Sequence, residues 1–205
     1  EKLKLPEKYQ LFYKPVMKGA IQAGYFNIVL DLNESDQIHH HHHHRHMADI
    51  RQILTQSELS NSTKEKSLRM FELLAIAEGK VHGVEAEQVH FHEVGATDSI
   101  LDIVGISTAL DYFEIKEVYS SSLPWCEGSV TTQHGQMPIP APATLELLRS
   151  CNATMRPFTA QVELITPTGA AFLAAFAKFE KPTITLEQQG SGAGTKDLPW
   201  PNILR

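Results

Sequence analysis

The sequence is poor in cysteine, in long apolar stretches and in positive charge. Its two cysteines, Cys126 and Cys151, allow at most one bridge, which excludes a disulfide framework and favours a reducing cytosol. No segment approaches the roughly 20 consecutive apolar residues of a membrane span. The 18 Lys and Arg residues against 24 Asp and Glu residues give a net charge of −6. Because nucleic acids and anionic bilayers attract basic surfaces, we expect a cytoplasmic protein with no nucleic acid and no membrane among its partners.

The N-terminus also lacks the marks of a chain start. Glu1-Lys2-Leu3-Lys4 contains neither an initiator Met nor the apolar stretch of a secretory signal peptide, so we expect the sequence to begin within a longer protein. The 205 residues are 42% hydrophobic and 20% charged, which is typical of a globular protein with one domain or two small ones. We favour a single domain over residues 1–205, with residues 1–38 separable as a small subdomain.

Hydrophobic spacing and turn residues predict strands that alternate with helices. This alternation favours a mixed α/β class, with a layered sheet packed against helices and a His-rich loop before a short helix. In the first half we predict a helical start after Pro6, a strand over 21–30, a short helix from Met47, a helix over 62–80 between a capping box at Ser62 and a stop at Gly83, a strand over 88–94, and a helix capped by Asp98 that reaches Leu110. In the second half we predict paired strands over 117–123 and 128–132, a helix from Pro140 to Leu148, a strand over 162–165, a helix capped by Thr166 that reaches Phe179, a strand over 183–186, and a loop over 190–197.

Histidine is the residue in excess, because seven of the 11 histidines lie between positions 39 and 46. On an extended backbone only alternate side chains share a side, so such a run can hold divalent metals in several registers. Imidazole suits Ni²⁺, Zn²⁺, Cu²⁺ and Co²⁺, and the run by itself does not select one of them. A purification tag and a solvated loop without a role are the alternatives. The candidate metal ligands are His39, His40, His41, His42, His43, His44 and His46.

A second group of candidate ligands follows the predicted strand over 88–94. His90 and His92 project from one face of that strand, whereas Glu93 faces away unless the strand ends there. Asp98 and Asp102 are four residues apart, so they are neighbours on one face of the next helix. These five residues are candidate catalytic groups, and the two histidines are also candidate metal ligands. The alternative assigns each a structural role as a helix cap, a first-turn acid or a hydrogen-bonded strand residue.

Two further segments are candidates for binding a phosphate, although each also fits an ordinary surface turn. A glycine-rich stretch near the C-terminus can form a nest of backbone N–H groups, and the predicted helix after Thr166 offers its N-terminus. The first stretch matches neither a Walker loop nor a Rossmann fingerprint. The candidate residues are Thr166, Thr168 and Gly169 in one segment and Gly192, Gly194, Thr195 and Lys196 in the other.

Five segments together resemble the LarC family of nickel insertion proteins. They are HHHHHHRHMADI at 39–50, KVHGVEAEQVHFHEVGATDSILDI at 80–103, MPIPAPATLELL at 137–148, LITPTGAAFL at 164–173 and GAGTKDLPWPNILR at 192–205. They occur in family order and span nearly the whole chain. Because the family carries its own His-rich loop before the short helix, the resemblance argues against a purification tag.

The resemblance implies a nickel chelatase, or cyclometallase, of the lyase class. Such a protein inserts Ni²⁺ into pyridinium-3,5-bisthiocarboxylic acid mononucleotide, forms one nickel–carbon and two nickel–sulfur bonds, and consumes CTP. The product is the nickel-pincer cofactor of lactate racemase-type enzymes, so an apo racemase-type acceptor is an expected partner, and we also expect a homo-oligomer. The family binds CTP and a divalent ion, Mn²⁺ or Mg²⁺, in a C-terminal domain. We expect this chain to correspond to the N-terminal module, without the family's opening Gly-Ile-Ser-Gly-Asp-Met-type segment.

The resulting hypothesis is a route for nickel through the imidazole-rich segments. Residues 39–46 collect Ni²⁺, His90 and His92 with Glu93 or Asp98 hold it for transfer, and a glycine loop or helix N-terminus docks the substrate phosphate. A non-catalytic nickel store, in which the His run is the whole function, is one alternative. A metal-dependent hydrolase that uses His90, His92 and Asp98 to activate water is another.

Overall fold

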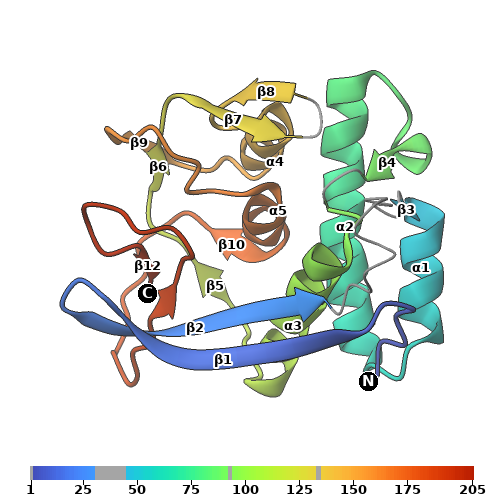
Figure 1. Ribbon diagram of the computed structural model, residues 1–205, viewed down its shortest axis with the longest axis horizontal. Coiled ribbons are helices and arrows are strands. Elements are labelled where there is room, and N and C mark those ends of the chain that lie inside the picture. The colour runs from blue at the N-terminus through green and yellow to red at the C-terminus, as the bar shows by residue number, and fades with distance from the viewer. Residues whose placement is uncertain (1, 31–44, 92–93, 133–134) are drawn as a thin grey trace. The chain divides into compact units, whose positions relative to one another are not determined.

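The computed structural model describes residues 2–30, 45–91, 94–132 and 135–205 (Figure 1). The chain divides into two compact units, one formed by Glu1–Leu5 and His41–Pro182 and the other by Pro6–His40 and Thr183–Arg205. All of the described helices lie in the first unit, and both units contain strands. The predicted mixed α/β class is therefore confirmed. In the described ranges, no helix has both the length and the apolar character required to span a bilayer.

The first unit is built around its longest helix, α2, which contacts each of the other four helices described (Figure 1). Apolar residues at helical spacing along α2 supply the centre of the core, and Phe71 packs on Phe91 with ring centroids 6.0 Å apart. Burial of each such large side chain contributes about 1.5–3 kcal/mol. The helices are α1 (Met47–Gln56), α2 (Asn61–His82), α3 (Thr97–Tyr112), α4 (Pro142–Ser150) and α5 (Pro167–Phe176), with a 3₁₀ turn, η1 (Ala86–Gln88).

Local capping residues explain where these helices begin and end. The Ser60 hydroxyl accepts a hydrogen bond from the Thr63 N–H at 3.0 Å, so α2 begins before the capping box predicted at Ser62. The predicted stop at Gly83 is confirmed, because this residue has the left-handed φ of 70° that glycine adopts freely. Thr166 caps α5 as predicted. The helix ends at Phe176 rather than at 179, because the next two residues join a strand.

Three further helix predictions need correction. The cap of α3 is Ala96, not Asp98, which instead lies in the first turn and accepts a hydrogen bond from the Ser99 N–H at 2.7 Å. The helix predicted from Pro140 begins at Pro142, where the missing N–H of proline costs nothing. The helical start predicted after Pro6 is wrong, because that segment is a strand in the second unit.

The strands of the first unit form short pairs. Parallel pairs join β5 (Val118–Tyr119) to β10 (Ala177–Lys178) and β6 (Leu123–Trp125) to β9 (Met155–Pro157). Antiparallel pairs join β3 (Arg45–His46) to β4 (His90–Phe91) and β7 (Ser129–Thr132) to β8 (Gly135–Pro138).

These pairings correct the strand predictions. The strand predicted over 88–94 is reduced to β4 in the described part, because η1 occupies the preceding residues. The segment 117–123 contributes to two separate pairs, and the strand over 128–132 pairs with the residues after it rather than with 117–123. Residues 162–165 form no strand, because their backbone finds no neighbouring strand among the described residues.

The second unit contains a four-stranded sheet in the order β1-β2-β11-β12. β1 (Tyr9–Lys18) and β2 (Ile21–Leu30) form the long hairpin in blue in Figure 1, paired in register from Lys18 opposite Ile21 to Tyr9 opposite Leu30. This full-length pairing overrides the predicted helical start. β11 (Gly192–Ala193) and β12 (Ile203–Leu204) complete the sheet, so a strand lies inside the predicted loop over 190–197. The strand predicted over 183–186 does not form.

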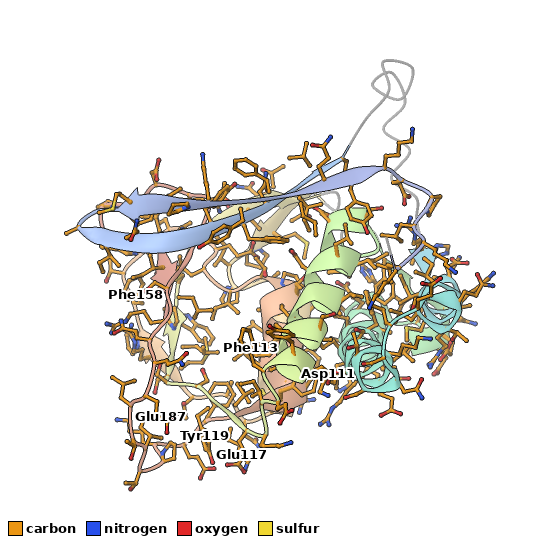
Figure 2. The ribbon with its side chains drawn as sticks, turned by 90° about the horizontal axis from the view of Figure 1, so that it is seen from below. Asp111, Phe113, Glu117, Tyr119, Phe158 and Glu187 are labelled. Carbon is orange, nitrogen blue, oxygen red and sulfur yellow. The ribbon has the colours of Figure 1, made fainter. Side chains whose placement is uncertain are left out.

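One carboxylate ties the end of α3 to the start of α2. Asp111, labelled in Figure 2 near the end of α3, accepts hydrogen bonds at 2.7 Å from the hydroxyls of Ser60, Ser62 and Thr63. The Lys66 ammonium lies 2.5 Å from the same carboxylate. These hydrogen bonds, led by the one from Lys66, hold the pKa of Asp111 well below its usual range.

Candidate functional site

Two candidate histidines from separate parts of the sequence meet in the first unit. β3 and β4 pair so that His46 lies opposite His90, and their ring centroids are 3.8 Å apart with the ring planes inclined at 53°. His46 is half-buried and His90 is exposed. The strand pairing therefore places two potential nitrogen ligands side by side at the surface of a folded element.

Arg45, which precedes His46 in β3, anchors this strand next to the histidine pair and is only 6% exposed. Its Nη1 donates a hydrogen bond to the carbonyl oxygen of Gly95 at 2.7 Å. Gly95 approaches the backbone of Phe91 so closely that a Cβ would lie 2.7 Å from the Phe91 carbonyl oxygen, which requires glycine. Because Phe91 is buried in the core, β4 cannot shift freely. The sequence interpretation missed Arg45, although an arginine interrupting the His run was a visible sign of a different role.

His46 also forms the start of α1. Its backbone N–H donates a hydrogen bond to Asp49 Oδ2 at 2.8 Å, which satisfies a donor at the helix N-terminus. Met47, the next residue, is buried in the core. These contacts fix the backbone from which the His46 ring projects.

The two candidate aspartates lie exposed on α3. Two effects raise the pKa of Asp102 to about 6. The larger is partial removal of its carboxyl group from water, and the smaller is the negative charge of Asp98. Within the described ranges, no three His, Cys, Asp or Glu residues are grouped so that they could hold one metal ion. The structure thus brings Asp98 and Asp102 into electrostatic contact and does not add them to the histidine pair. His39–His44, His92 and Glu93 lie outside the described residues.

The candidate phosphate-binding residues at the start of α5 are engaged in capping. The Thr166 side chain accepts a hydrogen bond from the Gly169 N–H at 3.2 Å, and its carbonyl oxygen accepts one from the Ala170 N–H at 2.9 Å. The Gly169 donor is therefore already used within the chain. Thr168 lies between these residues in the first turn and is half-buried.

The glycine-rich candidate segment belongs to the second unit, where it serves the sheet. Gly192 pairs with strands on both sides, and a Cβ on Gly194 would collide with the side chain of Asn202. The carbonyl oxygens of Thr195 and Lys196 accept hydrogen bonds from the Lys18 ammonium at 3.4 and 3.3 Å. This segment therefore turns acceptors toward a cation, which is the opposite of the donor arrangement that a phosphate requires.

The chain matches the nickel insertion protein family over residues 1–205. It belongs to this family. Relatives from Staphylococcus epidermidis and Staphylococcus saprophyticus, each named pyridinium-3,5-bisthiocarboxylic acid mononucleotide nickel insertion protein, are both 42% identical to it, over 98% and 99% of this chain and 49% and 50% of their own lengths. A relative from Geotalea daltonii, also named for nickel insertion, is 44% identical over 96% of this chain and 49% of its own length.

The chain thus spans about half the length of the curated relatives it matches. No solved structure matches it significantly. The resemblance described from the sequence motifs is confirmed at the level of the family.

Proposed function

We propose that this chain takes part in inserting Ni²⁺ into pyridinium-3,5-bisthiocarboxylic acid mononucleotide, and that His46 and His90 form part of its nickel-holding site. Membership of the nickel insertion family and the names of the staphylococcal relatives support the reaction. The observation that carries the residue assignment is the contact between the two imidazole rings across β3 and β4.

Nickel is the substrate here, so the site must bind the ion and then release it. Imidazole nitrogen is a suitable ligand for Ni²⁺, and two neutral nitrogens leave several coordination positions open for exchange. A closed site of four cysteines would hold the ion more permanently. Along the chain, further imidazoles occur close to the pair, in residues 39–44 before Arg45 and at His92 after Phe91. We propose that these residues collect the ion and that Glu93 or Asp98 completes its binding.

Formation of a nickel–carbon bond replaces a proton on the ring carbon, and that proton needs an acceptor. The pKa of Asp102, raised to about 6 by its surroundings and by Asp98, leaves its carboxylate ionised at neutral pH yet more basic than an ordinary aspartate. We propose that Asp102, with Asp98 beside it, receives this proton. The weaker proposals for phosphate binding are Thr166, Thr168, Gly169 and the 192–196 segment, because the Gly169 N–H already donates to Thr166 and the Thr195 and Lys196 carbonyl oxygens accept from Lys18.

The described residues do not form a binding site for the divalent ion that accompanies CTP. Among them, no three carboxylate, histidine or thiol side chains lie close enough together to bind one ion. That CTP is consumed by a lyase-class protein, that a lactate racemase-type enzyme accepts the product, and that the protein forms a homo-oligomer remain proposals supported by the family resemblance alone.

A nickel titration tests the proposal. We expect His46→Ala and His90→Ala each to weaken Ni²⁺ binding to the 205-residue chain by about tenfold or more, in line with the loss of a metal-site residue. His82→Ala is the matched control, because His82 lies at the end of α2 in an ion pair with Glu78. Equilibrium dialysis with ⁶³Ni²⁺ at pH 7.5 measures both affinity and stoichiometry.

The transfer step is then measured in the full-length protein with the thiocarboxylated nucleotide. Wild-type insertion by the His46→Ala/His90→Ala double variant would refute the residue assignment. If deletion of residues 39–44 abolishes Ni²⁺ binding while the double variant binds Ni²⁺ as wild type does, the chain is a nickel store.

A further inference from the structure

A hollow of about 480 Å³ opens beside β6 and β9 in the first unit, and none of the candidate residues singled out in the sequence lines it. Its volume lies within the range of about 300–1,000 Å³ that is usual for small-ligand sites. The side chains that give it chemical character are Trp125, Glu127, Arg156, Phe158, Thr159 and Gln161.

The backbone on both sides of the hollow is fixed by hydrogen bonds. The parallel β6–β9 pair sets Trp125 opposite Pro157, and the chain continues beyond it with the Phe158 N–H donating to the Trp125 carbonyl oxygen at 3.2 Å. The Glu127 N–H donates to the Ala160 carbonyl oxygen at 3.1 Å. Two segments distant in the sequence therefore form a rigid frame, which is the condition for a pre-formed binding site.

Side-chain alternation explains why this frame presents polar and aromatic groups outward. Cys126 is only 2% exposed, whereas Trp125 on one side of it is 43% exposed and Glu127 on the other is also exposed. Successive side chains in an extended segment point in opposite directions, so the buried cysteine turns its two neighbours toward the hollow. A tryptophan that keeps this much accessible surface beside a hollow is available to a ligand.

A cation lies beside the aromatic groups. The Arg156 guanidinium is 5.2 Å from the centre of the Phe158 ring, so the positive charge is held over an aromatic face (Phe158 is labelled in Figure 2). A flat aromatic surface and a planar guanidinium together recognise a planar ring that carries anionic groups. Glu127 supplies a negative charge that favours a cationic ring in the same place.

We infer that this hollow binds the pyridinium mononucleotide, with the ring stacked on Trp125 and an anionic substituent held by Arg156. The inference rests on the proposed function for the choice of ligand, since a pyridinium ring with carboxylate-type groups and a phosphate has the charges that the hollow matches. It also replaces the start of α5 and the 192–196 segment as the place where the nucleotide docks, because the Gly169 N–H already donates to Thr166 and the Thr195 and Lys196 carbonyl oxygens face the Lys18 ammonium.

The test uses the 205-residue chain and nicotinic acid mononucleotide, a pyridinium carboxylate mononucleotide, as the probe in isothermal titration calorimetry. Loss of one stacking contact is expected to weaken binding by about 5- to 150-fold in Trp125→Leu, whereas Trp125→Phe keeps a ring and stays near wild type. Arg156→Met is expected to weaken binding by at least about tenfold. Arg69→Met is the matched control, because Arg69 lies over the Phe176 ring at 5.8 Å and does not line the hollow.

Several outcomes overturn the inference. It is wrong if the wild-type chain shows no binding at millimolar probe, or if Trp125→Leu and Arg156→Met bind as wild type while circular dichroism shows them folded. Equal binding of ribose 5-phosphate, which lacks the ring, would show a phosphate site and refute stacking.

The proposed function fails separately. If the full-length protein inserts no nickel while the probe still binds through Trp125 and Arg156, the inferred nucleotide site is supported and the proposed reaction is wrong. If insertion proceeds and the hollow variants keep the wild-type KM for the nucleotide, the reaction stands and the hollow is excluded.

Discussion

Replacement of Asp111 by alanine should unfold the helical unit at a markedly lower denaturant concentration. This carboxylate accepts three hydrogen bonds of 2.7 Å from the hydroxyls at the start of α2 and contacts the Lys66 ammonium. Hydrogen bonds to charged groups contribute about 1.5–3 kcal/mol each. Because 22% of the Asp111 side chain is accessible, we take about 1 kcal/mol for each of the three and little for the ion pair.

The expected loss is therefore about 3 kcal/mol of a total stability of order 5–15 kcal/mol. With a urea dependence of about 2 kcal/mol per molar, the midpoint falls by about 1.5 M. Urea titration followed by circular dichroism at 222 nm measures this directly, because the described helices all belong to the unit that contains Asp111. Glu65→Ala, an exposed acid on α2, is the matched control and should change stability by less than about 0.5 kcal/mol.

The pH dependence provides a second check. Hydrogen bonds, led by that from Lys66, lower the pKa of Asp111 in the folded state, so the stabilisation is present above the unfolded pKa of about 3.9 and is lost as the pH falls through the folded value. The difference between wild type and Asp111→Ala should be full between about pH 5 and 7 and should shrink below about pH 4. A difference under about 0.5 kcal/mol at pH 7, or one that is unchanged at the lowest accessible pH, would refute the reasoning.

Two further predictions concern buried and titrating groups in the same unit. Thr144 is fully buried and its hydroxyl has no hydrogen-bond partner among the described residues, so Thr144→Val should raise the free energy of unfolding by about 1 kcal/mol in the same urea assay. Ser67→Ala is the comparison, because it removes a hydroxyl that donates to the Thr63 carbonyl oxygen and should therefore lower the free energy of unfolding. The pKa of Asp102 is raised to about 6, so ionisation of its carboxyl group destabilises the fold as the pH rises from about 4 to 7. Asp102→Asn should therefore reduce the dependence of the free energy of unfolding on pH between about 4 and 7. An unchanged slope over this range would contradict the prediction.

Features governed by neighbouring residues could be predicted from the sequence. The mixed α/β class, the short helix from Met47, the stop at Gly83 and the cap at Thr166 all depend on side chains within one or two helical turns. The error at the start of α2 was also local, since Ser60 and Ser62 offer similar capping chemistry, and it is the Ser60 hydroxyl that accepts the hydrogen bond from the Thr63 N–H. The aspartate pair on α3 followed from the helical repeat in the same way.

Strand pairing was not predictable in this way. The residues after Pro6 became a strand because β2 provides ten consecutive partners, and the segment over 128–132 paired forward to β8 rather than backward. Strand formation depends on a neighbour whose position the alternation of side chains does not specify. Residues 162–165 have a strand-like composition and no such neighbour among the described residues.

By itself the sequence determined the family, the approximate positions of α1 to α5 and the residue types able to bind nickel, because motifs and helix periodicity are properties of contiguous residues. Tertiary structure alone decided that His46 contacts His90, that Arg45 supports them, and that Trp125 and Arg156 frame a hollow. The physical reason is that each of these groupings depends on hydrogen bonds between distant strands, whose register is fixed only when the core around α2 is packed.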